Sequence, residues 1–322
     1  MKVFRGLPNA ASRAPCALAI GNFDGVHLGH QALLSELRTA ATRLGIDAAV
    51  MSFEPHPRAF FAQLMGDLSK APSRIANLRD NLSALDRAGV DRVIVEHFNA
   101  QFAALSPDDF IKQILVDGMH VKWVMVGDDF RFGAKRAGDI YTLIEAGKRY
   151  GFEVQAMETV AKQGVRVSSS AVRAALDAGD FEHVEELLGR PYQISGHVIH
   201  GQKLGRTLGF PTLNLRIAHH KPAVMGIFVV QVHGLREQPL PAVASMGVRP
   251  TVDDSGRVLL ETHILDHKVD AYGKIIHVEF LKKLRDEEKY VDLPTLTEAI
   301  NRDADQARSY FKQRHGSATD RI

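Results

Sequence analysis

Two histidines in a glycine-rich decapeptide have the type and spacing to handle phosphate. The decapeptide GNFDGVHLGH, residues 21–30, follows a short apolar run, and a helical pattern begins at its far end. His27 and His30 are one helical turn apart, so both imidazoles can point at one ligand. A helix N-terminus offers free N–H groups to phosphate, and glycines allow close backbone approach. This arrangement suits the charge that builds on pyrophosphate as it leaves the α-phosphorus of ATP.

The same decapeptide could instead be a glycine-rich turn whose histidines only cap the helix. For one histidine we would favour that interpretation, but the complete strand–loop–helix motif favours phosphate handling. A metal site on His27 and His30 is a weaker hypothesis, because no third ligand is evident nearby.

Three later polar segments are expected at the same edge of the sheet, because open α/β sheets bind ligands beyond the carboxyl ends of their strands. Residues 53–58 (FEPHPR) follow the second predicted strand, where two prolines predict an extended loop. Residues 127–133 (GDDFRFG) follow the fourth strand, and residues 168–173 (SSSAVR) open a helix after the fifth. The serine hydroxyls and Arg173 could hold phosphate. Taken alone, GDDFRFG indicates a turn and SSSAVR an N-cap.

A second phosphate-handling pattern is HGQKLGRTLGFPTLN, residues 200–214. Its glycines and basic side chains, Gly201 and Arg206 among them, predict a flexible loop able to fold over phosphates. The Walker A spacing is absent, so this is not a P-loop fold. Thr212 and Asn214 are two apart on a predicted strand and therefore share a face. Their oxygens could hold a Mg²⁺ ion that bridges ATP phosphates.

One carboxylate stands in the otherwise apolar start of segment 260–266 (LETHILD). Glu261 is either an exposed side chain or a general base held in a dry site. Spacing alone favours the exposed interpretation, because exposed carboxylates are common.

The elements that must position these residues differ between the two halves. The first half alternates apolar runs with helical patterns, which predicts βαβ units and a parallel sheet. Predicted strands are 17–20, 48–53, 92–95, 123–126 and 153–157, with helical periodicity at 33–44 and 75–85 and short helices at 169–178 and 181–188. After residue 188, β-rich runs follow one another at 192–200, 212–216, 226–233, 242–246, 258–265 and 275–280, before a helical pattern at 296–311. That series predicts a small antiparallel barrel or sandwich closed by a C-terminal helix.

Composition limits the classes of protein to consider. A length of 322 residues suggests two domains. The 40 basic and 38 acidic residues give a net charge of only +2, so we expect no nucleic-acid or membrane partner. Cys16 is the only cysteine, which argues for a reducing compartment and against structural zinc. No signal-peptide core or membrane-length apolar run is visible, so a cytoplasmic location is expected.

The quoted motifs resemble known families in both halves. The HxGH loop with the later serine–arginine segment resembles the adenylyltransferase branch of the nucleotidyltransferases. The longer strings GNFDGVHLGHQ, FEPHPR, VGDDFRFGA and VSSSAVR resemble the FMN adenylyltransferase half of bacterial bifunctional riboflavin kinase/FAD synthetases. HGxxLGRxLGFPTxN, ETHILD, YG and LRDEEKY resemble the riboflavin kinase family, whose fold is a six-stranded antiparallel barrel with a C-terminal helix. The resemblance covers nearly the whole chain, with implied domains 1–185 and 186–322.

The resemblance implies a set of site residues. In the adenylyltransferase half, the implied ATP-binding residues are Gly21, Asn22, Phe23, Asp24, His27, His30, Ser168, Ser169, Ser170 and Arg173. Both histidines are implied to be catalytic, and the implied flavin-binding residues are Phe53, His56, Asp128, Asp129 and Phe130. In the kinase half, Gly201 and Arg206 would lie in the ATP loop, with Thr212 and Asn214 as Mg-ATP residues. Glu261 would be the catalytic base, and Arg285 would contact flavin.

Two departures from the family pattern fall in the kinase half. The family has PTAN where this chain has PTLN, and Leu213 should face away from Thr212 and Asn214 on a regular strand. We therefore expect the metal site to survive. Ser245, in SMGVRPTV, stands in a string that in the family contains asparagine.

The implied chemistry is riboflavin to FMN, then FMN to FAD, with ATP as the second substrate of both steps. Phosphorylation of a hydroxyl calls for a base and Mg²⁺, whereas the FMN phosphate is already anionic and calls only for positioning. Alternatives are a monofunctional riboflavin kinase with a decayed N-terminal domain, and a non-catalytic flavin- or RNA-binding regulator. A class I aminoacyl-tRNA synthetase is disfavoured, because Leu68-Ser69-Lys70 is a poor KMSKS mimic too close to the HxGH element.

Overall fold

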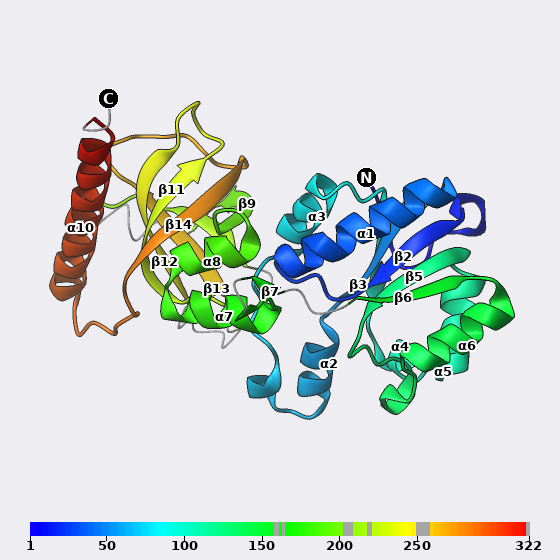
Figure 1. The fold of residues 1–322 in the computed structure, drawn as a ribbon. Helices are drawn as coiled ribbons and strands as arrows, with labels where there is room; N and C mark the ends of the chain where they lie inside the picture. The colour runs from blue at the N-terminus through cyan, green and yellow to red at the C-terminus, as the bar shows by residue number, and fades with distance from the viewer. Residues whose placement is uncertain (158–160, 163–164, 202–208, 218–220, 249–257, 320–322) are drawn as a thin grey trace. The chain divides into compact units, whose positions relative to one another are not determined.

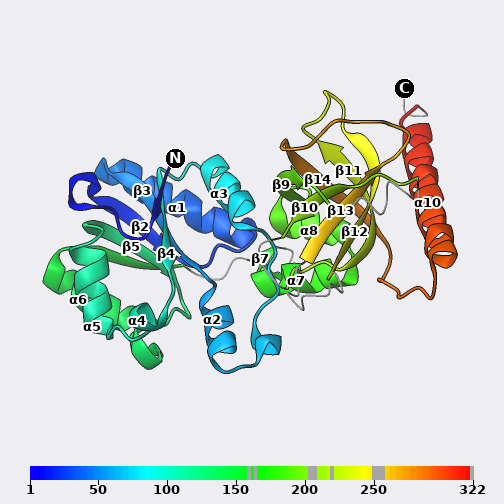
Figure 2. The same ribbon diagram turned by 180° about the vertical axis from the view of Figure 1, so that it is seen from behind.

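The computed structural model describes residues 1–157, 161–162, 165–201, 209–217, 221–248 and 258–319. The chain forms two compact units (Figure 1, with the reverse view in Figure 2). The first unit comprises Met1–Pro72 and Asn81–Ser169. The second comprises Ser73–Asp80 and Ser170–Ile322, so a short piece of the first half of the sequence belongs to the second unit.

The first unit is built on a six-stranded sheet in which all neighbouring strands are parallel. The strands are β1 (Lys2–Arg5), β2 (Cys16–Ile20), β3 (Asp47–Glu54), β4 (Arg92–His97), β5 (Val121–Gly127) and β6 (Glu153–Met157), in the order β1-β4-β3-β2-β5-β6. The predicted parallel sheet is confirmed. Sequence patterning missed β1, a four-residue strand at the edge of the sheet beside β4.

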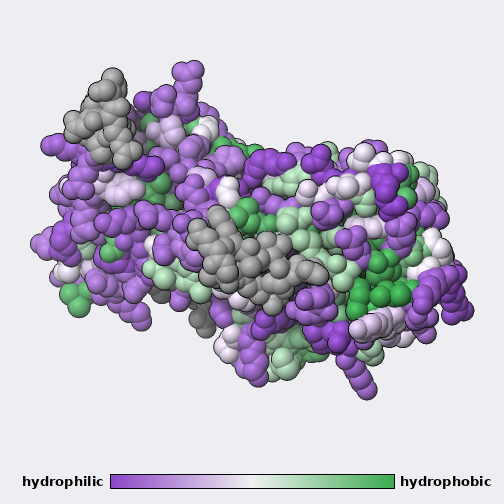
Figure 3. Space-filling view, viewed as in Figure 1, coloured by the Kyte–Doolittle hydropathy of each residue, from purple (hydrophilic) through white to green (hydrophobic). Residues whose placement is uncertain are grey.

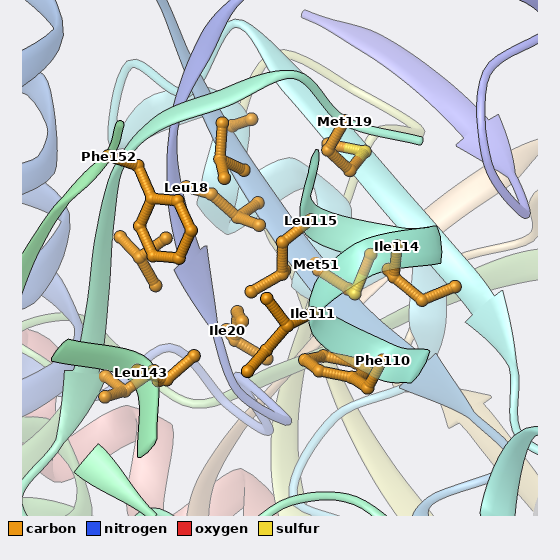
Figure 4. Packing of buried hydrophobic residues seen from close by; sticks show 14 of the residues in the cluster. Leu18, Ile20, Met51, Phe110, Ile111, Ile114, Leu115, Met119, Leu143 and Phe152 are labelled. Atoms are coloured by element: carbon orange, nitrogen blue, oxygen red, sulfur yellow. The ribbon is translucent and has the colours of Figure 1, made fainter. Parts of the chain in front are cut away.

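Helices of the first unit cover both faces of this sheet, except for α2 (Pro57–Leu64), which lies away from it (Figure 1). They are α1 (Leu28–Leu44), α2 (Pro57–Leu64), α3 (Leu78–Arg87), α4 (Ala100–Ala103), α5 (Pro107–Asp109), a π-helix (Phe110–Val116) and α6 (Ile140–Tyr150), with 3₁₀ turns at Ala10–Ser12, Leu68–Lys70 and Ala134–Arg136. Every residue of β2 is buried. Leu18 and Ile20 point to one face, where Figure 4 shows them packed with Ile111 and Leu115 of the π-helix. The alternate residues of β2 face the other way, where α1 packs.

The second unit is a closed antiparallel barrel with helices attached. Its strands are β9 (Gln193–Ile199), β10 (Leu213–Arg216), β11 (Gly226–His233), β12 (Leu240–Val248), β13 (Val258–Ile264) and β14 (Ile275–Arg285), in the order β10-β13-β12-β11-β14-β9. Its helices are α7 (Ser169–Ala178), α8 (Phe181–Leu188) and the C-terminal α10 (Leu293–Thr319). The predicted six-stranded barrel with a C-terminal helix is confirmed. In the first unit, β7 (Ala161–Lys162) pairs antiparallel with β8 (Val165–Arg166) shortly before α7.

Apolar side chains on both faces of the barrel wall pack against helices α8 and α10. Phe228 of β11 and Phe280 of β14 lie 5.1 Å apart between ring centroids, and Phe181 of α8 lies 5.9 and 5.8 Å from them. On the other face of β11, Val229 packs against α10 through a cluster that includes Phe311. Consecutive residues of β11 point to opposite faces, and each face is covered by a helix or by other strands. Both faces of β11 are therefore apolar.

The segment Ser73–Asp80, which we call the strap, is hydrogen-bonded to the barrel unit. The Tyr192 hydroxyl donates to the Ile75 carbonyl at 2.8 Å. Asp80 accepts hydrogen bonds from both the backbone N–H and the hydroxyl of Ser195. Burial raises the pKa of Asp80, and the two bonds from Ser195 oppose that rise. The strap is therefore held by specific polar contacts and not by chain continuity alone.

The face of the molecule in Figure 3 is mostly hydrophilic, with hydrophobic side chains in separate patches. Among the helices of the described ranges, none is long and apolar enough to cross a membrane.

Candidate active sites

The glycine-rich loop of the first unit lies where the sheet changes direction. From β2 the chain proceeds to β3 and β4 on one side, and β5 and β6 then add on the other side of β2. Such a switch point, at the carboxyl ends of the strands, is the usual ligand site of open α/β sheets. Residues 21–27 follow β2 directly at this point, and α1 begins at Leu28. The topology thus places the predicted phosphate loop at the expected edge.

The backbone of this loop is held in an unusual conformation. Phe23 and Val26 have positive φ angles, 48° and 41°, although neither is glycine, and both are 1% exposed. Gly25 also has a positive φ, and its N–H donates to the Asn81 side-chain oxygen at 2.9 Å. Asp24 is buried as well. Non-glycine residues in this region are a form of strain that concentrates at functional sites.

His27 and His30 lie together at the start of α1. His27 is the N-cap, and its Nδ1 accepts a hydrogen bond from the His30 N–H at 3.3 Å. The two imidazoles stack with centroids 3.7 Å apart. Because Nδ1 accepts, a neutral His27 carries its proton on Nε2 and can still donate to a ligand. Helix capping and phosphate binding are therefore compatible roles for this histidine.

The other residues predicted for this loop have different surroundings. Gly21 lies over the Phe23 ring, which a Cβ would meet at 3.2 Å, while Asn22 is exposed and its carbonyl accepts from the Ser52 hydroxyl. A Cβ on Gly29 would lie 3.1 Å from His27 Nδ1 and 3.2 Å from the Val167 carbonyl. The chain entering the serine segment therefore runs beside the histidines.

The serine–arginine segment falls on the division between the units. Ser168 and Ser169 belong to the first unit, and α7 begins at Ser169. Ser170 and Arg173 belong to the second unit, where Arg173 Nε donates to the Ser73 carbonyl of the strap at 2.6 Å. Arg173 therefore has a structural partner in addition to any ligand.

The segment after β3 differs from the sequence expectation. The Glu54–Pro55 peptide is cis, and α2 begins at Pro57, so the prediction of an extended loop is wrong beyond His56. Proline at the first helical position costs no hydrogen bond, because that N–H has no helical partner. His56 is buried and caps this helix by accepting from the Arg58 N–H at 3.1 Å.

Aromatic side chains gather at the carboxyl ends of β3, β4 and β5. Phe53 lies 5.9 Å from Phe98 and 5.7 Å from Phe102 between ring centroids. The series continues along the same edge through Phe60, Phe61, Phe110, Phe132 and Phe130, each within 6.1 Å of another member. Phe61 is 43% exposed, so an aromatic surface is open to solvent. Sequence reasoning named Phe53 and Phe130 but missed Phe98 and Phe102, although both follow the third predicted strand in the string FNAQF.

Asp128 and Asp129, the other residues predicted at this edge, are exposed in the turn after β5.

In the second unit, Thr212 and Asn214 lie side by side at the start of β10. Asn214 is 4% exposed, and its Nδ2 donates to both the carbonyl and the hydroxyl oxygen of Thr212 at 3.3 Å. Its Oδ1 is buried and, within the described part of the chain, has no hydrogen-bond partner. A Cβ on Gly201 would lie 2.6 Å from Asn214 Nδ2 and 2.8 Å from its Cγ. Glycine at 201 thus allows the backbone to lie against the amide.

Strand register places Asn214 next to Glu261 and Ser245. Asn214 of β10 pairs directly with Glu261 of β13, and Glu261 pairs on its other side with Ser245 of β12. Directly paired residues share a face of the sheet. Leu213 pairs with Thr262, so it faces the opposite side of the barrel wall. Glu261 is half-buried, an exposure between its two predicted alternatives.

Arg285 forms a bidentate ion pair with α10. Its Nε and Nη2 donate to the two carboxylate oxygens of Asp303 at 3.0 and 2.7 Å, and Asp303 is 4% exposed. These hydrogen bonds raise the pKa of the Arg285 guanidinium. The pair fixes the start of the segment between β14 and α10. The predicted ATP-loop residue Arg206 lies outside the described residues.

Comparison with known proteins agrees with both halves of this description. A family model described as FAD synthetase matches residues 9–171, and one described as riboflavin kinase matches residues 188–311. The chain is 46% identical over 314 residues to the bifunctional riboflavin kinase/FMN adenylyltransferase of Escherichia coli K12, covering 97% of this chain and 98% of that one. It is 45% identical over 310 residues to the enzyme of the same name from Pseudomonas fluorescens, covering 96% and 97%.

A solved structure also resembles the whole chain. It is the crystal structure of a protein named macrolide-efflux protein from Streptococcus pneumoniae, with a TM-score of 0.68 and 26% identity over 95% of this chain and 98% of that one. The relatives and both family models agree on the family of this sequence. The chain belongs to the family of bifunctional riboflavin kinase/FMN adenylyltransferases.

Proposed function

We infer that this chain makes flavin cofactors in two steps, phosphorylating riboflavin with ATP to give FMN and then adenylylating FMN with ATP to give FAD and pyrophosphate. The observation that carries this inference is the match to both enzymatic families in one chain, with relatives of the same name aligned almost end to end. We propose residues 186–322 as the kinase domain and residues 1–185 as the adenylyltransferase domain.

Adenylylation needs positioning and charge stabilisation, which the loop after β2 can supply. A phosphate oxygen of FMN attacks the α-phosphorus of ATP, and the bond to pyrophosphate breaks. The nucleophile is already an anion, so no base is required. His27 and His30 can donate to phosphate oxygens from beside the N-terminus of α1, where the helix dipole also favours negative charge. Residues 21–24, Ser168, Ser169, Ser170 and Arg173 complete the proposed ATP site.

The aromatic series beside this loop fits the ring system of FMN. Planar aromatic ligands pack well on aromatic side chains, and Phe61 leaves part of that surface exposed. We propose that Phe53, Phe98 and Phe102 support the flavin end of the site. His56, Phe130, Asp128 and Asp129 lie on segments that leave the same edge of the sheet.

Phosphorylation of riboflavin needs a base, and Glu261 has the position for it. The terminal ribityl hydroxyl attacks the γ-phosphorus of ATP, ADP leaves, and the proton passes to the Glu261 carboxylate. The Thr212 hydroxyl and the buried Asn214 amide oxygen suit a hard cation, since that oxygen lacks a partner among the described residues. When bound there, Mg²⁺ would neutralise phosphate charge. Gly201 and Arg206 are the proposed ATP-loop residues, and Arg285 is proposed to lie near the flavin.

The test is to incubate the purified chain with riboflavin and ATP, with and without Mg²⁺, and to separate the flavins by chromatography. We expect FMN first and FAD later, and EDTA should stop the first step. FMN without FAD would favour a monofunctional kinase. Riboflavin binding without turnover would favour a non-catalytic regulator. We propose that these small molecules are its partners, in the cytoplasm and without nucleic acid or membrane.

A further inference from the structure

A second carboxylate lies on the same face of the barrel as the proposed base. The row of paired residues runs from Asn214 of β10 to Glu261 of β13 and then to Ser245 of β12. The Ser245 hydroxyl donates to Glu287 Oε1 at 3.2 Å. Glu287 comes from the segment between β14 and α10, far from β13 in sequence. Two carboxylates thus flank one serine.

The backbone of β12 makes room for this carboxylate. Gly247 is two residues after Ser245 and therefore shares its face. A Cβ on Gly247 would overlap both carboxylate oxygens of Glu287. Glycine here lets the Glu287 carboxylate lie directly on the strand, while the Ser245 hydroxyl fixes its orientation. Both contacts hold the side chain over the row.

The charge of Glu287 is suited to accepting hydrogen bonds. Although much of the side chain is exposed, burial of its carboxylate raises its pKa, and the neighbouring Glu261 charge raises it further. The Ser245 hydrogen bond and Arg285 oppose this rise. An ionised carboxylate is a strong acceptor for hydroxyl groups. Its Oε2 has no hydrogen-bond partner among the residues that the structure describes.

The order of groups along the row matches the order of groups in the substrate. Asn214 is at the proposed cation and phosphate end, and Glu261 is the proposed base, which would face the terminal hydroxyl. Ser245 lies one strand further, about 5 Å away, where the rest of the ribityl chain would pass. The row continues from Ser245 to Ile227 of β11, which pairs with Arg285 of β14, the proposed flavin neighbour.

We propose that Glu287 binds the secondary hydroxyls of the ribityl chain and so selects a polyhydroxylated flavin substrate. Ser245 and Gly247 are positioning residues for this carboxylate. The buried Asn214 amide at the other end of the row points independently to a ligand on this face, since its Oδ1 has no partner within the described ranges. This inference rests on the proposed kinase function.

The test pairs a variant with a substrate that lacks the groups it would bind. Riboflavin is compared with an isoalloxazine carrying a 5-hydroxypentyl chain, which keeps the terminal hydroxyl and lacks the secondary ones. We expect Glu287→Gln to lower kcat/KM for riboflavin about tenfold or more, mainly through KM, because a charged acceptor is lost. For the hydroxypentyl analogue the change should be less than about threefold.

Two further variants separate binding from general damage. Asp286→Asn makes the same change of charge one residue away, where the exposed carboxylate pairs with Lys283 at 2.7 Å, and it should behave as wild type. Gly247→Ala should displace the Glu287 carboxylate without removing its charge and reproduce the selective loss. FAD synthesis from FMN, measured on each variant, reports that the first unit is intact, and denaturant unfolding followed by circular dichroism reports folding of the barrel.

Equal losses for both substrates in Glu287→Gln would overturn the proposal, because they would place the effect at the base or in the fold. Unchanged kinetics with riboflavin would overturn it as well. A wild-type protein that phosphorylates neither substrate would instead refute the proposed function, a result easily told apart from these.

Discussion

The two candidate sites place their polar groups on different kinds of structure. In the first unit they lie on a loop with positive φ angles and at a helix N-terminus, and no carboxylate base is proposed. In the second they lie on paired strands, with Glu261 fixed between Asn214 and Ser245 by register. The difference follows the nucleophiles. An anionic phosphate needs stabilisation of the leaving group, for which backbone and imidazole donors suffice, whereas an alcohol needs a base held at a defined place.

Removing the proposed base should have the largest effect, and on the kinase reaction alone. Glu261→Gln keeps the size and hydrogen-bonding capacity of the side chain but cannot accept the ribityl proton. We expect FMN formation to fall about 10²–10⁴-fold, measured as initial rate with saturating ATP. FAD formation from supplied FMN should be unchanged, because that step needs no base. Near-normal FMN production would return Glu261 to the class of exposed carboxylates.

The reciprocal change concerns the histidines. His27→Ala or His30→Ala should lower FAD formation about 10²–10³-fold, the usual effect of losing one donor to a developing oxyanion. FMN should then accumulate from riboflavin at the normal rate. His27→Ala also removes an N-cap, so circular dichroism should accompany the assay. Loss of both activities in a folded variant would contradict independent sites.

A substitution beside Asn214 tests the proposed cation site of the kinase. Gly201→Ala would force a methyl group against the Asn214 amide. Misplacing a metal-binding group by about 1 Å can cost up to about a hundredfold in rate, so we expect kinase activity to drop about tenfold to hundredfold. The Mg²⁺ concentration for half-maximal activity should rise. An unchanged Mg²⁺ dependence would separate Asn214 from the cation.

The last prediction concerns the stability of the barrel and the Asp80 side chain of the strap. Asp80 has its pKa raised above its ordinary 3.8 chiefly by burial, so its ionisation opposes folding. Relative to Asp80→Asn, the wild-type barrel should therefore lose unfolding free energy as pH rises through the raised pKa. Denaturant unfolding at acid and neutral pH measures this difference. Two curves that stay parallel across that range would show that Asp80 is not coupled to barrel stability.

Local sequence patterns predicted the strands and the loop whose structure depends on residues close in the sequence. Short β-rich runs broken by Gly and Pro located β9, β11 and β13. The HxGH loop was placed correctly between a strand and a helix because it depends on these two neighbouring elements alone. The aromatic series was missed because Phe53 and Phe98 meet only when β3 pairs with β4. Exposure of Glu261 could not be decided from spacing, since its neighbours come from β10 and β12.

The strap is a second feature that local sequence patterns could not predict. Ile75 fits the helical periodicity of the residues after it, and the sequence therefore predicted a helix from that point. In the structure α3 begins at Leu78, and the Ile75 carbonyl accepts from Tyr192, 117 positions away. A long-range hydrogen bond of this kind leaves no periodic trace in the sequence.

The strap also means that no single cut in the polypeptide yields both units whole. A fragment that starts at residue 186 lacks Ser73–Asp80, so it loses the hydrogen bonds that Tyr192 and Ser195 make to the strap. It also lacks Phe181, whose ring packs on Phe228 and Phe280. A gene for the barrel alone would have to replace these contacts, because the unit they stabilise is not one continuous stretch of the sequence.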